Sequence, residues 1–590
     1  MRARLADMLL RRPWATVLPL VVLLPFLLSG AVRFSLGWSL ERSLLACGTA
    51  LALAMLGFGL PRLPASGRVA TLGTFAVALT LVACTYRLWW TPVLHGLPNT
   101  SVGVDVGNHI ITYQRFIGAH HRQYEGFVGL YALMYWYERL SASHGVSPTA
   151  SMYYALRFAH YAAVLSIPVA LALVVHPSLA SLKGRAEQFA ALLLTLPVQV
   201  CVLAVLVFPP VQYYQAAGFY AQIAGLFPLL FGWLLFGLCE DAGERLVVCG
   251  FWLVVQRFTY GLNLGDAFLT CAILWSLDLR ELGSTWLRWG ARLFIPAALG
   301  GAYLVYLKLW PLRGMQGYFT EHSIGWLLPS ELVLSLALLV APSAFSSVAV
   351  SVSDAARRLW RYAGTFGLIN GTITVLYLAS GAPQRYYIFK YSLYAVVLVM
   401  ISSVGPVAVL IAHLISKGSR SACGREALRV LAGGVAMYAL VLLGLWKGHQ
   451  AYHTQAVERY ERTKPPVQLY SHFEPRVDAF IDRTLSARNA QFGGYYDPFW
   501  SRMFLMNALR FQLSSRRDYV FNRAFERAER MFPDEPGKCY FWLGKPEDYA
   551  GALHRPMGEH LRELNAQRAS CERFPVQWSE NEQTVCATCF

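Results

Sequence analysis

The sequence predicts an all-α polytopic membrane protein of about thirteen transmembrane helices, followed by a C-terminal extracytoplasmic domain of mixed, mainly helical structure. Three observations support this class. Apolar residues make up 56% of the 590 positions. Charged residues make up only 14%, whereas a soluble domain has about 25%. Apolar stretches near the length of a membrane-spanning helix recur as far as residue 446. An ordinary water-soluble enzyme and a disordered chain are therefore excluded.

The predicted spans form a series with mostly short connections. They cover residues 14–31, 43–60, 69–88, 155–176, 188–208, 218–238, 246–261, 263–279, 292–310, 331–350, 362–380, 391–415 and 427–446. The pair between 246 and 279 is the weakest, because both spans are short and only a Tyr-Gly-Leu-Asn turn separates them. Merging the two would reverse the orientation of every later segment.

The distribution of Lys and Arg predicts the orientation. If the N-terminus is cytoplasmic, every inner loop is basic. The residues concerned are Arg62, Arg68, Lys183, Arg185, Arg245, Arg280, Arg288, Arg292, Arg357, Arg358, Arg361, Lys417, Arg420, Arg425 and Arg429. Two separate spans between 246 and 279 preserve this pattern and place residues 447–590 outside, as expected in a bacterial inner membrane with a periplasmic C-terminus. The net charge of +17 is then explained by topology rather than by nucleic-acid binding.

The N-terminus and the cysteines bear on the same orientation. Residues 1–31 resemble a signal peptide, but the apolar core is nearly long enough to span and lacks a small-x-small cleavage site, which favours an uncleaved first span. Four of the 11 cysteines follow the last span: Cys539, Cys571, Cys586 and Cys589. In an oxidising compartment this even number predicts one or two disulfides. Zinc is the alternative, because only two residues separate Cys586 from Cys589.

The outer loop 89–154 contains the strongest candidate for a catalytic acid. Asp105 lies between Gly103 and Gly107, in a turn where the backbone can approach a ligand closely. Asn108 and His109 follow it. A helix beginning here would put His109 on the same face as Asp105, where the imidazole could orient the acid or an acceptor. A histidine that merely packs or faces headgroups is the alternative.

Later in the same loop, residues 125–138 are aromatic and apolar but too short to span, which predicts a segment lying along the interface. A second candidate region separates the spans 362–380 and 391–415. It contains Arg385, Tyr387 and Lys390, on the side where positive charge is normally depleted. Such a group could bind a phosphate. The alternative is a set of snorkelling side chains that anchor a helix end.

Other polar residues near outer helix ends complete the candidate set. They are Tyr220, Gln222, Arg257, Asp266, Glu321 and His322. Charge inside a bilayer is costly, so such groups tend to face a polar cavity or one another. Arg257 and Asp266 flank the turn of the weak hairpin, where a structural ion pair is the alternative to a role in binding substrate.

Two segments, Gly-Phe-Tyr-Ala-Gln-Ile-Ala-Gly at 218–225 and Arg-Tyr-Tyr-Ile-Phe-Lys at 385–390, look like segments at outer helix ends of bacterial GT-C glycosyltransferases. The overall plan of spans, early acidic loop and outer C-terminal domain also resembles this class. The resemblance implies inverting transfer of a sugar from a polyprenyl-phosphate donor to an extracytoplasmic glycan, lipid or protein acceptor. Asp105 would be the general base, and Arg385, Lys390 and Tyr387 would hold the donor phosphate.

The sequence departs from the GT-C pattern in one respect. Asp105 is a single acid after the third predicted span, whereas many members have paired acids, so the use of a divalent metal is left open. Two other functions are compatible with many spans and few buried charges: a secondary transporter or flippase of a lipid-linked or polar substrate, and an O-antigen ligase or polymerase. No Walker motif or dinucleotide-binding glycine pattern occurs, which disfavours soluble-nucleotide chemistry.

Overall fold

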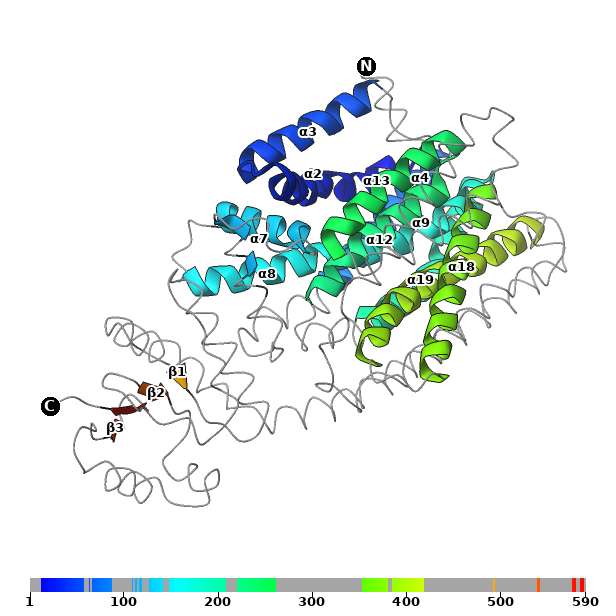
Figure 1. Ribbon diagram of the computed structural model, residues 1–590. Coiled ribbons are helices and arrows are strands. Elements are labelled where there is room, and N and C mark those ends of the chain that lie inside the picture. Colours follow the sequence, from blue (N-terminus) through cyan, green and yellow to red (C-terminus); the bar gives the residue numbers. More distant parts are fainter. Residues whose placement is uncertain are drawn as a thin grey trace, which may run out of the picture.

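The computed structural model describes most of the predicted membrane domain up to residue 418 and a small sheet near the C-terminus. The described residues are 12–57, 63, 66–86, 109, 112–113, 116–118, 127–141, 148–207, 220–260, 353–379, 385–418, 492–493, 539–541, 576–579 and 584–587. The helices pack as a bundle (Figure 1). They are α2 (Trp14–Leu36), α3 (Leu40–Gly57), α4 (Arg68–Thr85), α7 (Val128–Ser141), α8 (Pro148–Val164), α9 (Ser166–Ala180), α10 (Arg185–Leu206), α12 (Tyr220–Leu238), α13 (Ala242–Tyr260), α18 (Asp354–Ala379) and α19 (Arg385–Gly418).

The described helices agree with a polytopic membrane protein. Among the described residues, six helical segments are long and apolar enough to cross a bilayer: Trp14–Leu36, Arg68–Thr85, Phe158–Ala180, Arg185–Leu206, Tyr220–Leu238 and Leu393–Ser416. The predicted spans 43–60, 246–261 and 362–380 also fall largely on helices, namely α3, α13 and α18. The spans predicted at 263–279, 292–310, 331–350 and 427–446 lie outside the described residues, so the total of thirteen stays a prediction.

One predicted span, 155–176, is divided between two helices. Helix α8 ends at Val164 and α9 begins at Ser166, with a turn at Leu165. The cause is local. Pro168 has no backbone N–H, so it cannot donate to the carbonyl of Val164 as a continuous helix would require. Ser166 Oγ instead donates to the carbonyl of Ala163 at 2.5 Å.

Helix α19 begins six residues earlier than the predicted span at 391–415, with Arg385 as its first residue. Arg385, Tyr387 and Lys390 therefore belong to the helix rather than to the connection before it. The apolar pattern missed this turn and a half because its side chains are charged or aromatic, which helical backbone geometry tolerates. With 34 residues, α19 is about 51 Å long, more than a hydrocarbon core of about 30 Å requires.

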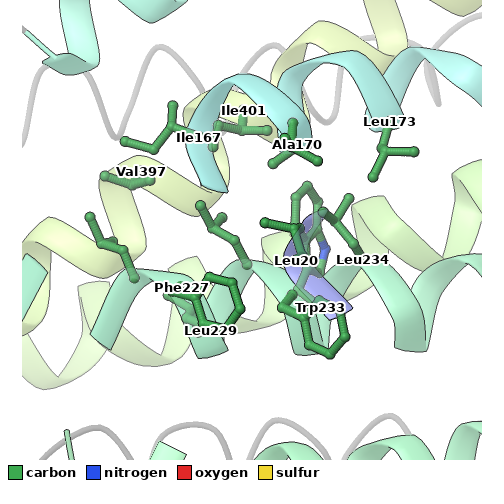
Figure 2. Packing of buried hydrophobic residues seen from close by; sticks show 14 of the residues in the cluster. Leu20, Ile167, Ala170, Leu173, Phe227, Leu229, Trp233, Leu234, Val397 and Ile401 are labelled. Atoms are coloured by element: carbon green, nitrogen blue, oxygen red, sulfur yellow. The ribbon is translucent and has the colours of Figure 1, made fainter. Parts of the chain in front are cut away.

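Helix α12 lies at the centre of the bundle. All 19 of its residues are buried, and it contacts α8, α9, α13, α18 and α19. Figure 2 shows part of this core, in which Leu20 of α2, Ile167 of α9 and Val397 of α19 belong to one apolar cluster with Phe227 of α12. A helix that is apolar on every side is expected where a protein surrounds it completely.

Glycines let the neighbouring helices approach α12 closely. A Cβ added at Gly232 would lie 2.0 Å from the ring of Trp252 on α13. At Gly237 it would lie 2.3 Å from Leu359 on α18. In a bilayer the lipid tails are as apolar as the protein core, so helices associate through this kind of close packing at small residues. Trp233 Nε1 also donates to the carbonyl of Leu359 at 3.0 Å, which ties α12 to α18.

Contacts between helix termini define two ends of the bundle. Phe34 near the end of α2 meets Phe258 near the end of α13, with ring centroids 6.3 Å apart. A Cβ added at Gly225, near the start of α12, would lie 2.7 Å from the Cβ of Tyr260, the last residue of α13. We call this the outer end, after the predicted orientation. At the inner end, Arg358 of α18 donates to the carbonyl of Gly237 at 3.1 Å.

The positions of these termini bear on the weak hairpin. Helix α13 runs by itself from the inner end, beside the end of α12, to the outer end at Tyr260. The predicted span 246–261 is thus a complete crossing of the bundle, as expected if 246–279 contains two spans. Helix α18 then begins at the inner end. The three spans predicted between Tyr260 and Asp354 lie outside the described residues and stay a prediction.

The described residues after 446 form a four-stranded sheet in the order β1-β2-β4-β3. The strands are β1 (Phe492–Gly493), β2 (Cys539–Phe541), β3 (Val576–Ser579) and β4 (Thr584–Ala587). Strand β1 is parallel to β2, and the other two pairs are antiparallel. The helical part of the predicted C-terminal domain lies outside the described residues and stays a prediction.

The close packing at Gly232 makes a testable prediction. Replacing Gly232 with Ala forces a methyl group into the Trp252 ring, and such overpacking costs about 1–3 kcal/mol. We expect a clear loss of thermal stability for the purified protein in detergent. Gly250→Ala is the matched control, because a Cβ there meets nothing within 4 Å and alanine favours a helix by about 0.8–1.0 kcal/mol over glycine. Equal melting temperatures for the two variants would contradict the packing described for α12.

Candidate functional site

A series of aromatic rings connects several elements at the outer end. The ring of His109 lies edge-on to Phe127, with centroids 5.4 Å apart. Phe127 stacks on Tyr260 of α13 at 6.0 Å, and Tyr260 lies 5.8 Å from Tyr394 of α19. The series therefore runs from the segment that follows Asp105 to the helix that begins with Arg385. His109 and the first turns of α19 therefore lie at the same end of the bundle.

The first turn of α12 contributes to the same region. The hydroxyl of Tyr394 donates to the backbone carbonyl of Gln222. Gln222 and Tyr220 are both buried, and the ring of His160 on α8 lies edge-on to Tyr220 at 5.2 Å. Tyr220 and Gln222, which the sequence predicts to be polar contributors at an outer helix end, are thus buried where α12 packs against α8 and α19.

His109 is a buried histidine with a polar partner. Its Nδ1 lies 3.2 Å from the hydroxyl of Tyr131 on α7, and 6% of its surface is exposed. The described neighbours are aromatic, as the packing alternative requires, yet the hydrogen bond also fixes the orientation of the imidazole. The shared helix face with Asp105 is not tested, because Asp105 and Asn108 lie outside the described residues.

The sequence interpretation missed Arg33, which binds the chain just after the His109 region. Its guanidinium donates to the carbonyls of Phe116 at 2.9 Å, Ile117 at 2.7 Å and Gly118 at 3.2 Å. A fourth bond goes to Trp38 at 3.0 Å, and the guanidinium lies 5.6 Å from the centre of the Phe116 ring. Arg33 therefore attaches the outer loop to the end of α2. An arginine just beyond the predicted span 14–31, on the side depleted in positive charge, was the available signal.

Glu138 on α7 is a second acidic side chain at this end and was also missed. It accepts a hydrogen bond from the hydroxyl of Tyr113. Burial raises the pKa of Glu138, and the bond from Tyr113 opposes that shift. The rings of Tyr113 and Tyr131 have centroids 6.3 Å apart. Tyr113 therefore links the Glu138 carboxyl to Tyr131, the hydrogen-bond partner of His109. Its position at the end of the aromatic segment 125–138 was the only sequence signal.

A more exposed group ties α3 to α7 beside Glu138. The hydroxyl of Tyr135 donates to Glu41 at the start of α3, and Arg139 Nε donates to the same hydroxyl at 2.9 Å. The bond from Tyr135 lowers the pKa of Glu41. The direct Arg139–Glu41 pair, at 3.6 Å, has both side chains more than half exposed and contributes little to stability. The group therefore connects the start of α3 to α7 at the outer end.

The predicted phosphate-binding residues lie in the first turns of α19, so the helical backbone sets their positions around the helix axis. Residues three, four or seven positions apart share one face of a helix. Tyr387 and Lys390 therefore share a face of α19 with Tyr394, whose hydroxyl binds Gln222. Arg385 precedes Tyr394 by nine positions, about half a turn away around the helix. The helical register thus distinguishes Lys390 from Arg385, which the sequence alone treats alike.

The remaining predicted site residues are only partly covered. Arg257 is half-buried in the last turn of α13, but its predicted partner Asp266 lies outside the described residues, as do Glu321 and His322. Among the described residues there is no cluster of three or more His, Cys, Asp or Glu side chains that could hold a metal ion.

The role of Arg33 can be tested through the motion of the loop that it binds. Hydrogen bonds to a charged group contribute about 1.5–3 kcal/mol each. We expect Arg33→Met to raise amide exchange in residues 109–118 by at least about tenfold, which corresponds to the loss of one such bond, measured by hydrogen–deuterium exchange and mass spectrometry. Arg42→Met is the control, because Arg42 is exposed near the same end of the bundle. An equal increase in both variants, or none in Arg33→Met, would show that Arg33 does not hold this segment.

Comparisons with known proteins give a distant likeness. No protein-family model matches the sequence, and no curated protein matches it significantly. Among solved structures, the chain is similar to the crystal structure of ArnT from Cupriavidus metallidurans bound to undecaprenyl phosphate. The sequence identity is 13%, the TM-score is 0.39, and the match covers 87% of this chain and 96% of that one. At these values the likeness does not assign the chain to a family.

Proposed function

We propose that the protein is a membrane glycosyltransferase that moves a sugar from a polyprenyl-phosphate donor to an extracytoplasmic acceptor. The ring series from His109 through Phe127 and Tyr260 to Tyr394 is the observation that supports it. Because of that series, the segment after Asp105 and the start of α19 belong to one end of the bundle. A transferase of this kind needs a base and a phosphate-binding group within the length of one sugar phosphate.

The reaction needs few protein groups, because the sugar already has a good leaving group. Asp105 accepts the proton of the acceptor hydroxyl as its oxygen attacks the anomeric carbon. The bond from that carbon to the phosphate oxygen breaks, and the configuration at the carbon inverts. The polyprenyl phosphate leaves with the negative charge, which Lys390 and Arg385 stabilise.

The geometry of α19 supports different roles for the two cations. Lys390 and Tyr387 share the face of Tyr394 and are our choice for direct contact with the donor phosphate. Arg385 is the first residue of the helix, where the unpaired backbone N–H groups of the first turn also favour an anion. Arg385 then assists from the headgroup side.

The other candidates are assigned to orientation and substrate contact. His109, held by Tyr131 at 3.2 Å, orients Asp105 or the acceptor. The remaining residues proposed to contact sugar or acceptor are Asn108, Tyr220, Gln222, Arg257, Asp266, Glu321 and His322. Glu138 is a second carboxyl on the same side of the bundle, and its raised pKa makes it a weaker acid than Asp105 would be in water.

The direct test is incubation of the purified protein with polyprenyl-phosphate sugars labelled in the sugar, together with a membrane-extract acceptor. A transferase removes the label from the lipid. A flippase leaves the label on the lipid and changes only the leaflet in which it is found, which vesicle reconstitution would reveal. Label that stays on the lipid under all acceptor conditions would reject the proposal.

For the proposed base, we expect Asp105→Asn to reduce transfer by about 10²–10⁴-fold, the usual contribution of a general base, while the melting temperature stays unchanged. Turnover of the labelled donor measures this. Asp354→Asn is the remote control, because Asp354 is exposed in the first turn of α18 at the inner end and should retain full activity. Glu138→Gln separates the two carboxyls. Loss of activity in Glu138→Gln with normal activity in Asp105→Asn would move the base to α7.

For the donor phosphate, we expect Lys390→Gln to lower kcat/KM by about 10- to 100-fold, because a charge-assisted bond contributes about 1.5–3 kcal/mol. Lys390→Arg should recover part of this loss, and Arg385→Gln should have the smaller effect. Steady-state kinetics at varied donor concentration measures each change. Arg361→Gln, at an exposed inner-end position of α18, serves as the charge-matched control. A larger loss in Arg361→Gln than in Lys390→Gln would refute the assignment.

A further inference from the structure

The register of the C-terminal sheet pairs two cysteines. In the antiparallel pair of β2 and β4, Cys539 lies directly opposite Cys586. These are two of the four cysteines that follow the last predicted span, and they are 47 positions apart in sequence. We propose that Cys539 and Cys586 form a disulfide that joins β2 to β4.

The geometry of antiparallel strands suits this bond. Opposite residues have Cα atoms about 4.5 Å or about 5.5 Å apart, depending on whether the pair is hydrogen-bonded. Disulfides span Cα separations of about 4.4–6.8 Å, so both kinds of pair fall in the range. Opposite residues also lie on the same face of the sheet. The next pair along the ladder, Tyr540 and Val585, lies on the other face.

A crosslink would also stabilise the sheet. Its strands are two to four residues long, and strands this short hold together weakly by themselves. Strand β4 is hydrogen-bonded to both β2 and β3, so a bond to Cys586 fixes the strand that organises the hairpin. A disulfide over a loop of this length acts chiefly by restricting the unfolded chain.

The chemistry needs an oxidising compartment. Two thiols lose two protons and two electrons as the sulfur–sulfur bond forms. The oxidant is a protein disulfide of the thiol–disulfide oxidase class, which is reduced to a dithiol through a mixed-disulfide intermediate. Cytosolic conditions keep such thiols reduced. The inference therefore rests on the predicted outer location of residues 447–590, and it is independent of the transferase proposal.

The test is peptide mapping of the full-length protein. Cells are lysed in N-ethylmaleimide, and the protein is purified in detergent, digested without reduction and examined by mass spectrometry. We expect a peptide pair linked through Cys539 and Cys586 that separates on reduction. Cys539→Ser should free one thiol for alkylation, at Cys586, and Cys586→Ser should free Cys539. Cys201→Ser, in α10, is the control and should leave the linked pair intact.

Three outcomes would overturn the inference. Cys539 and Cys586 could both be alkylated before reduction, which would show two thiols. Either one could be linked to Cys571 or Cys589 instead. Elemental analysis could find stoichiometric zinc that is lost in Cys586→Ser and Cys589→Ser alike, which would make the pair metal ligands. The mapping of the unaltered protein decides among these even if a variant fails to fold.

Discussion

The close approach of helices to α12 is the constraint on which the rest of the bundle depends. Hydrocarbon offers no advantage for burying one apolar surface against another, so the helices are held by contact area and by a few polar bonds. Gly225, Gly232 and Gly237 permit that contact with α13 and α18. Because α13 is pressed against α12, its last residue, Tyr260, is in reach of both Phe127 and Tyr394. The packing at the centre thereby sets the geometry at the outer end.

Parts of this fold could be predicted from the sequence because the bilayer imposes a simple rule on composition. Helices α2, α4, α10 and α12 each contain a long apolar stretch, and each falls within a few residues of its predicted span. The start of α19 could not be found in this way, because Arg385 and Lys390 satisfy helical geometry while violating the apolar pattern. The break at Leu165 depends on one proline inside an otherwise uniform apolar run.

The site shows a similar division. Sequence reasoning selected His109, Tyr220 and Gln222, and all three are buried at the outer end. It missed Arg33, whose carbonyl partner on Phe116 is 83 positions away in the chain, and Glu138, whose partner Tyr113 is 25 positions away. Composition and spacing report on neighbours along the chain. A hydrogen bond between residues far apart in the chain produces no periodic pattern in the sequence.

Helix α19 has a consequence for how a lipid substrate would be held. Its first turns and its buried core segment are one continuous rod, anchored at Tyr394 to the carbonyl of Gln222. Arg385 and Lys390 therefore belong to the same helix as the buried core segment rather than to a loop. If the proposed polyprenyl-phosphate donor binds there, these cations would contact its headgroup, and its tail would extend into the bilayer. Under the proposed function, recognition at this place would depend on the charge of the headgroup rather than on the length of the tail.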